Sequence, residues 1–505
     1  MNNIEHVVVV MMENRSFDSL LGWLYNNDTD PPPFNIPSQR PTTFDGLSAG
    51  KYSNVLNGQT LNAIHPPTGW PPSNNPALVP APDPQEEFDH ITRQLFGTAT
   101  PVPGAVPDMS GFLADYATTT AGSANAGQIM QSFGPQDANV INQLARSFAV
   151  CDRWFASVPS QTWPNRAFIH AGSSDGHINN DNYELYDIPT IFNVLESQGQ
   201  SWGVFHNTTL IPSLTLGQFF GQLAGVQDHF HRYDVFQKLC QASATSPMSA
   251  RLPSYSFVEP RFTPEPGLFT IDYPNDYHPP HNVCRGEQFL AGVYQSVRNS
   301  PYRDNILLVI LFDEHGGCYD HVPPPSGAAA PQPSPLSRDG QFNFSRFGVR
   351  IPAIVISSYV QPGTVFRSSS GEPPYDHTSI LATLRDWLLL SSDPNHPFLP
   401  SPRIQQAPTL DRVLALDDQN KNVNWPNITA QCVVGSDDQS LQTPLNDVQK
   451  SLIAIAIRQT SSDPTNAATS ATAAQTAKSL VTYQHALSLL HPAIAPAPPP
   501  APPAQ

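Results

Sequence analysis

The sequence ILLVILFDEHGGCYDHVPPP, residues 306–325, decides the fold of this chain. It opens with a continuous apolar run, Ile306–Phe312, and such a run bounded by turn residues is typical of a strand buried on both faces of a parallel sheet. Asp313 and Glu314 follow directly, and ligands collect at the carboxyl ends of strands in open α/β sheets. A structural turn needs only one Asp and a Gly, so two adjacent carboxylates favour a site for a divalent cation.

A similar arrangement stands near the N-terminus. Residues 4–12 form a second continuous, β-branched apolar run, which predicts another buried strand. Glu13 and Asn14 follow it and place an acid and a side-chain oxygen at its carboxyl end. Ser16 could cap a short helical segment over 17–24, but a cap explains one polar residue and not the whole cluster.

The remaining elements alternate along the chain. Further strands are predicted over 202–206, 252–258 and 349–357, and helices over 140–150, 189–197, 286–296, 380–389, 448–458 and 473–490. This alternation indicates a wound α/β sheet. The Pro-rich segments 26–84 and 323–347 are long enough to be functional lids or disordered loops, and Trp70 in the first of them could contact lipid.

Composition excludes several classes of partner. The chain has 505 residues, of which 13% are charged, and a formal charge of −17. We therefore expect no nucleic acid partner and no purely electrostatic attraction to anionic membranes, because both need clusters of Lys and Arg. No apolar run approaches the length of a membrane span, and no secretory signal is visible. We expect a cytoplasmic protein as written, or one exported by a signal-independent route or given in its mature form.

The five cysteines are scattered along the chain without a CxxC spacing. We therefore expect neither a zinc motif nor a disulfide framework, and at least one free thiol.

Thr162 is a candidate for phosphate chemistry. It stands between Pro159 and Pro164, just before a helix predicted to open over 167–172. A hydroxyl near a helix N-terminus lies in a positive field with free backbone N–H groups, which suits a phosphate. An ordinary helix cap would explain the same hydroxyl, so this segment alone leaves both interpretations open.

Five motifs together resemble the bacterial phospholipase C and AcpA-type acid phosphatase family, which includes the plant non-specific phospholipases C. They occur in family order between residue 4 and about residue 390. They are ENRSFD at 13–18, TWPNR at 162–166, DYHP at 276–279, FDEHGGCYDHV at 312–322 and YDHTSIL at 375–381. The resemblance implies an alkaline-phosphatase-like α/β sandwich, with a largely parallel central sheet flanked by helices.

The resemblance also implies roles for individual residues. One divalent ion would be held by Glu13, Asn14, Thr162, Asp313 and Glu314. Thr162 would be the nucleophile, and His278 and His90 would be the other catalytic residues. Phosphate would be bound by Asn165, Arg166, His315 and His377. Asn282 departs from the Asp of many relatives, and oxygen ligands favour Ca²⁺, Mg²⁺ or Mn²⁺ as the metal.

These assignments make chemical sense together. A threonine hydroxyl is a weak nucleophile until a metal or a base activates it, and a divalent ion can also neutralise charge on the phosphoryl group. A histidine would protonate the leaving alkoxide. We therefore expect a double displacement through a phospho-Thr162 intermediate.

The expected substrate is a phospholipid or a small phosphate ester, with a transient contact to a membrane surface. The favoured function is a phospholipase C that cleaves a phosphatidylcholine-type diester to diacylglycerol and a phosphorylated head group. An acid phosphatase is the alternative. A non-catalytic phosphate-binding protein would have lost a ligand or the nucleophile, and a sulfatase would need a formylglycine-type motif, which is absent from the sequence.

Three parts are expected along the chain. A catalytic domain would span 1–430, with lid-like loops at about 26–130 and 323–347. A C-terminal helical segment would follow over 431–492, and the Ala/Pro-rich residues 493–505 would form a mobile tail.

Overall fold

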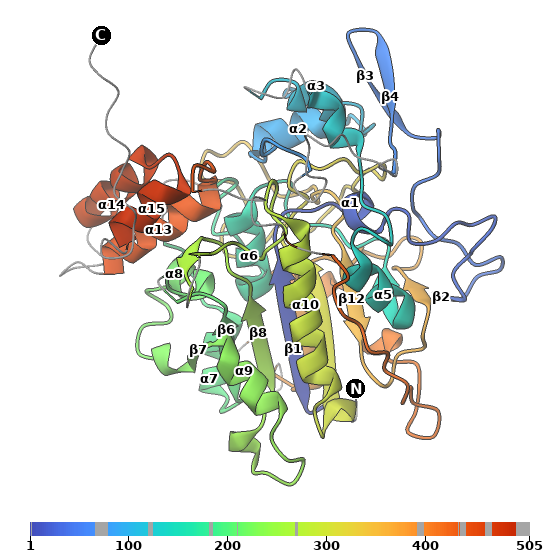
Figure 1. Cartoon of the computed structure of the whole chain (residues 1–505), viewed down its shortest axis with the longest axis vertical. Coiled ribbons are helices and arrows are strands. Elements are labelled where there is room, and N and C mark those ends of the chain that lie inside the picture. The colour runs from blue at the N-terminus through green and yellow to red at the C-terminus, as the bar shows by residue number, and fades with distance from the viewer. Residues whose placement is uncertain are drawn as a thin grey trace.

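A nine-stranded sheet lies at the centre of the molecule (Figure 1). The computed structural model describes residues 1, 3–65, 79–119, 125–180, 185–209, 211–267, 271–390, 398–432, 434, 441–459 and 467–490. Within these residues the strands are β1 (His6–Met12), β2 (Phe34–Ile36), β5 (Ala149–Cys151), β6 (Trp202–His206), β7 (Phe230–Arg232), β8 (Tyr255–Glu259), β11 (Ile306–Phe312), β12 (Ala353–Ile356) and β13 (Thr364–Phe366).

Their order in the sheet is β2-β13-β5-β12-β11-β1-β8-β6-β7. Strand β12 runs antiparallel to both of its neighbours, and the other pairings in this order are parallel. The predicted α/β fold with a largely parallel central sheet is therefore confirmed. Two small pairs lie outside this sheet: β3 (Ser53–Leu56) with β4 (Gln59–Asn62), and β9 (Glu265–Pro266) with β10 (Ile271–Asp272).

Strands β1 and β11 are the centre of the core. They pair in parallel from His6 opposite Ile306 to Met12 opposite Phe312, and every residue of both strands is buried. Burial on both faces explains why these strands are apolar throughout instead of alternating. The bounds of β11 match the predicted strand, and β1 begins two residues later than predicted.

Helices cover the sheet. In Figure 1, α10 crosses in front of β1, and α5 and α9 pack beside α10, whereas α6 packs with α7 and α11. A separate group, α13 to α15, lies at one side of the molecule and contacts α8. The helices are α1 (Phe17–Leu21), α2 (Phe88–Phe96), α3 (Phe112–Tyr116), α5 (Asn139–Ser147), α6 (Thr162–Ala171), α7 (Ile191–Ser197), α8 (Leu214–Gln218), α9 (Tyr233–Cys240), α10 (Val283–Arg298), α11 (Thr378–Trp387), α12 (Pro402–Gln406), α13 (Asp447–Gln459), α14 (Ala467–Ser479) and α15 (Tyr483–Leu490). In the described part of the chain, none of the helices is long and apolar enough to span a membrane.

Two helix predictions are wrong in part. The helix predicted over 140–150 ends at Ser147, because the apolar residues after it join the sheet as β5 between β12 and β13. The helix predicted over 473–490 is split into α14 and α15. At the break, the Val481 carbonyl accepts a hydrogen bond of 2.9 Å from the Leu445 N–H, so tertiary pairing replaces the helical bond.

The cysteines differ from the expectation in one respect, because one disulfide is present, while the expected free thiol is confirmed. Cys284 and Cys432 form a disulfide across 148 residues and tie the start of α10 to the segment before the C-terminal helices. Such a separation has no signature in local spacing. Cys151, Cys240 and Cys318 are buried free thiols.

Other expectations stay predictions. The segment over 26–130 contains β2, β3, β4, α2 and α3, and its lid-like role is untested, as are the domain boundaries. Trp70 and the tail at 493–505 lie outside the described residues.

A buried ionic cluster joins the segment just before β12 to the turn after β11 and to α1. Arg350 donates from Nε to Asp320 and from Nη2 to Asp18, each at 2.9 Å. Asp18 also accepts from the His321 ring at 2.6 Å. Burial and the Arg350 charge oppose the charged ring, but Asp18 and Asp45 outweigh them and raise the pKa of His321 from 6.5 to about 9.

We expect this histidine to make stability depend on pH. A pKa that folding raises contributes stability that is complete below pH 6.5 and is lost as the pH rises through about 9. The thermal unfolding midpoint should therefore fall across that window. His321→Gln should lower the midpoint at pH 6 and flatten this slope, and an unchanged slope in the variant would refute the assignment.

Candidate active site

The pairing of β1 with β11 brings four predicted ligands together. Since Met12 is opposite Phe312, Glu13 and Asn14 leave the sheet beside Asp313 and Glu314. The Asn14 N–H donates to Asp313 Oδ1 at 3.0 Å. All four residues are fully buried. The carboxyl edge of the sheet therefore collects the acidic side chains, as predicted from the two apolar runs.

A close backbone contact shapes this edge. Asn14 has a left-handed backbone with a φ of 50°, a conformation that asparagine tolerates better than most residues. Gly316 also has a positive φ, and a Cβ there would lie 2.1 Å from the Asn14 carbonyl oxygen. The two glycines after His315 in the sequence therefore reflect a turn that must pass directly over Asn14.

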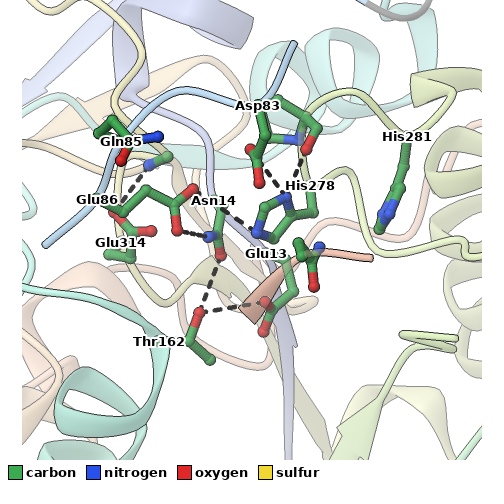
Figure 2. Close-up of polar contacts among 12 residues, drawn as sticks. Glu13, Asn14, Asp83, Gln85, Glu86, Thr162, His278, His281 and Glu314 are labelled. Carbon is green, nitrogen blue, oxygen red and sulfur yellow. Dashed lines mark hydrogen bonds and ion pairs between the residues drawn. The ribbon is translucent and has the colours of Figure 1, made fainter. Parts of the chain in front are cut away.

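Thr162 lies against the same group of residues. It is the first residue of α6, and its Oγ1 is 3.3 Å from both Glu13 Oε2 and Asn14 Oδ1 (Figure 2). The structure thus brings the predicted nucleophile to the predicted cation ligands.

Asn165 supports the position of Thr162. Its amide nitrogen donates to the carbonyls of Ser160, Val158 and Gln161 at 2.8, 3.1 and 3.2 Å. Its side-chain oxygen accepts from the Val158 N–H at 3.1 Å. This amide holds the turn before Thr162, and phosphate binding by Asn165 stays a prediction.

Arg166 supplies positive charge behind the site. Its Nε donates to Glu13 Oε1 at 2.9 Å and lies 3.5 Å from Asp313 Oδ2. Burial and the neighbouring Asp313 raise the pKa of Glu13 well above its usual value, while Arg166 opposes this. The Arg166 guanidinium thus contacts the carboxylates of Glu13 and Asp313 in this structure. Phosphate binding by Arg166 stays a prediction.

The donor set fits a divalent ion. Asp313 Oδ2 and Glu314 Oε1 are buried and accept no hydrogen bond. Burial and Asp313 raise the pKa of Glu314 well above its usual value. Buried carboxylate oxygens without a hydrogen bond are costly, and hard divalent cations prefer carboxylate ligands. Glu13, Asn14, Asp313, Glu314 and the Thr162 hydroxyl are therefore a suitable set for one ion.

Comparison with known proteins identifies the family. The Phosphoesterase family matches residues 4–390. This chain belongs to the Phosphoesterase family. Non-specific phospholipase C3 of Arabidopsis thaliana is 34% identical over 81% of this chain and 73% of its own length. Phospholipase C B of Mycobacterium tuberculosis (strain ATCC 25618 / H37Rv) is 25% identical over 76% of this chain and 73% of its own length. The solved structure of an alkaline phosphatase superfamily protein from Vibrio parahaemolyticus aligns over 50% of this chain and 60% of its own chain. The sequence identity is 12% and the TM-score is 0.30.

The family fixes the reaction class. Its description, and the names of relatives that align along most of this chain, make the protein a hydrolase that acts on phosphoric ester bonds. The resemblance predicted from the five motifs is therefore confirmed.

Two predicted histidines of this phosphoesterase lie at opposite ends of one hydrogen-bond chain. The His90 ring is 2.9 Å from Asp115 Oδ1, and Asp115 Oδ2 accepts from Gln94 at 3.0 Å. The Gln94 side-chain oxygen is 2.8 Å from His315 Nε2, and His315 Nδ1 is 3.1 Å from Glu314. His315 therefore holds Glu314, while no contact in the described part of the chain joins His90 to Thr162. The predicted roles of His90 in catalysis and of His315 in phosphate binding stay predictions.

His377 contacts the backbone at the end of β11. Its Nε2 is 3.0 Å from the Phe312 carbonyl, and its Nδ1 accepts from the Ser157 N–H at 3.3 Å. Both ring nitrogens are therefore used to hold the strand end, and phosphate binding by His377 stays a prediction.

The structure adds two residues that the sequence analysis missed. Glu86 Oε2 accepts from the Asn14 side chain at 2.9 Å, and Glu86 Oε1 lies 3.6 Å from His278 Nε2. Asp83 Oδ1 lies 3.5 Å from His278 Nδ1 (Figure 2). Both acids precede α2, where acidic residues are common for helix-dipole reasons, so their sequence gives no distinct signal.

A pocket of about 480 Å³ lies beside these acids. Its wall includes Asp83, His90 and His281, together with Leu445 and Asn446 just before α13. In α13, the Gln449 side chain lies 3.2 Å from His281 Nε2. The segment leading into the C-terminal helices therefore forms one wall of this pocket, a role that the sequence left open.

We expect Arg166 to be essential for the stability of this edge. Arg166→Met would leave Glu13 and Asp313 without their buried partner and should lower the free energy of unfolding by roughly 3–5 kcal/mol. Urea denaturation of the metal-stripped protein measures this change.

Arg153 provides the matched control. Its pair with Asp45 is half exposed, with 50% of the Arg153 side chain accessible, so Arg153→Met should cost less than about 1 kcal/mol. Equal effects of the two substitutions would contradict the buried ion pair.

Proposed function

We propose that this phosphoesterase is a metal-dependent phospholipase C that acts through a covalent phospho-Thr162 intermediate. The observation that carries the proposal is the buried Thr162 hydroxyl, 3.3 Å from Glu13 and Asn14 and beside two carboxylates whose oxygens Asp313 Oδ2 and Glu314 Oε1 accept no hydrogen bond. The names of the relatives, plant non-specific phospholipases C and a mycobacterial phospholipase C, support a phospholipid diester over a monoester.

The reaction would proceed by two displacements. Thr162 Oγ1 attacks phosphorus, the bond from phosphorus to the diacylglycerol oxygen breaks, and that oxygen takes up a proton. Water then attacks the phospho-Thr162 ester, releases the phosphorylated head group and returns a proton to the threonine oxygen. A divalent ion held by the acidic residues would supply the charge that lowers the hydroxyl pKa and neutralises the phosphoryl oxygens.

The neighbouring residues have separate tasks in this scheme. Glu13 Oε2 lies 3.3 Å from the Thr162 hydroxyl and, as the carboxylate in reach, accepts its proton, while Arg166 orients Glu13 from behind. Asn165 keeps the turn before Thr162 in place. The pocket beside Asp83 receives the head group, since ligand pockets usually measure about 300–1,000 Å³. Phosphatidylcholine is the proposed lipid.

A paired assay of p-nitrophenylphosphorylcholine and p-nitrophenyl phosphate tests the nucleophile. Thr162→Ala should reduce diester hydrolysis by at least about 10³-fold, because the covalent route is lost, while Thr162→Ser should retain activity. Mass spectrometry of acid-quenched protein should find the phosphorylated residue 162 in the active forms.

A buried threonine outside the predicted ligand set serves as the control. Thr190 caps α7 through its hydroxyl, so Thr190→Ala should lower stability by about 1 kcal/mol and leave turnover unchanged. Full activity of Thr162→Ala would refute the mechanism. A preference for the monoester in the wild-type protein would make it a phosphatase.

Removal of the metal should abolish hydrolysis. After dialysis against EDTA, activity should fall at least about 100-fold, because a bound divalent ion contributes several kcal/mol to the transition state. Added Ca²⁺, Mg²⁺ or Mn²⁺ should restore it in the wild-type protein but not in Asp313→Asn. Activity that survives exhaustive chelation, with no metal detected in the protein, would contradict metal dependence.

A further inference from the structure

Three side chains beside the predicted cation ligands form a second cluster with metal-binding geometry. Asp83, Glu86 and His278 each offer one ligand atom, and these atoms all lie within 4.8 Å of one another. Glu86 and His278 are buried, and Asp83 is partly exposed, with 31% of its side chain accessible. Figure 2 shows the His278 ring between the two acids, while His281 lies apart from them.

The two acids lack a positive partner. Asp83 Oδ1 and Glu86 Oε1 are buried atoms without a hydrogen bond. In the described ranges of the chain, neither residue forms an ion pair with Lys or Arg, and Arg15 nearby donates instead to the Tyr277 and Val79 carbonyls. A carboxylate that is buried in this way needs a cation or a proton.

His278 is oriented as a ligand. Its Nδ1 lies 2.7 Å from the Pro279 carbonyl, and since a carbonyl only accepts, Nδ1 carries the proton. The other nitrogen, Nε2, then presents its lone pair toward Glu86 Oε1 at 3.6 Å. A backbone carbonyl that fixes the tautomer in this way is typical of metal-binding histidines, whereas a lone pair facing a carboxylate is repulsive without a cation between them.

The cluster around Arg350, described above with the fold, shows the contrast. Among the described residues, Asp18, Asp320 and His321 are the other group with suitable spacing. There Arg350 donates to both carboxylates at 2.9 Å, so a protein side chain already supplies the charge. The cluster at Asp83 has the same composition of two acids and a histidine but no arginine within it.

We propose that Asp83, Glu86 and Nε2 of His278 bind a second divalent cation, next to the ion assigned to Glu13, Asn14, Asp313 and Glu314. Two carboxylates and one imidazole nitrogen suit Zn²⁺ or Mn²⁺ better than Ca²⁺ or Mg²⁺.

Glu86 connects the two positions. Its Oε2 accepts a hydrogen bond from the Asn14 side-chain amide, and its Oε1 faces His278 Nε2. A second ion held there would supply further positive charge for the transferring phosphoryl group, as metal ions do in two-metal phosphoesterases. His278 becomes a ligand and does not transfer protons.

Metal counting tests the proposal without reference to activity. The full-length protein is stripped with EDTA, equilibrated with MnCl₂ or ZnCl₂ and desalted, and its metal is measured by mass spectrometry. We expect about two ions per wild-type chain and about one in Asp83→Asn and Glu86→Gln. Asp313→Asn, which alters the neighbouring position, should also retain about one.

Glu87→Gln is the matched control, because it removes the same charge one residue further along, outside the cluster, and should retain about two ions. Anomalous diffraction at the manganese or zinc edge locates the ions in the wild-type protein without any substitution. We expect one peak between Glu86 and His278 and another beside Asp313.

The outcomes separate this site from the proposed function. If the wild-type protein, Asp83→Asn and Glu86→Gln all bind one ion per chain, the second site is overturned and the phospholipase C proposal stays intact. A single anomalous peak beside Asp313 would have the same meaning. If the wild-type protein binds one ion per chain and Asp83→Asn binds none, the result supports the site at Asp83 and contradicts the ligand set assigned around Thr162.

Discussion

Negative charge buried at the carboxyl edge of the sheet is the constraint on which the rest of the site depends. Glu13, Asp313, Glu314 and Glu86 converge there, and within the part of the chain that the structure describes, Arg166 is the arginine that pairs with Glu13 and Asp313. Moving several carboxylates out of water costs several kcal/mol each unless cations accompany them. Binding of the proposed divalent ions would therefore be coupled to the folding of this edge.

The parts of the fold that follow from local sequence were predictable. The residues of β11 are apolar throughout because both faces of that strand are buried, so its bounds could be read from composition alone. The bounds of β6 also match the predicted strand, although its last residue, His206, is polar and only partly buried. Glu13, Asn14, Asp313 and Glu314 were recognisable because each pair directly follows such a strand, and parallel pairing then places the two pairs side by side.

The features that were missed depend on contacts between distant parts of the chain. Asp83 and Glu86 reach the site only because the loop before α2 folds over the Gly316–Gly317 turn, where Pro84 would be 2.5 Å from a Cβ on Gly317. His90, four residues beyond Glu86, lies instead in the pocket wall, where its ring contacts Asp115. The break between α14 and α15 likewise reflects pairing with residue 445. Neither composition nor periodicity reports such contacts.

The position of β1 in the sheet has a consequence for biosynthesis. Strand β1 is an inner strand of the sheet, and its partners β8 and β11 begin only at Tyr255 and Ile306, so they are synthesised later. At translation rates of about 5–20 residues per second, β11 emerges on the order of 15 to 60 s after β1. Both edges of the sequence HVVVVMM are unpaired until β8 emerges, and one edge is still unpaired until β11 emerges, so the nascent strand is exposed to pairing with other chains.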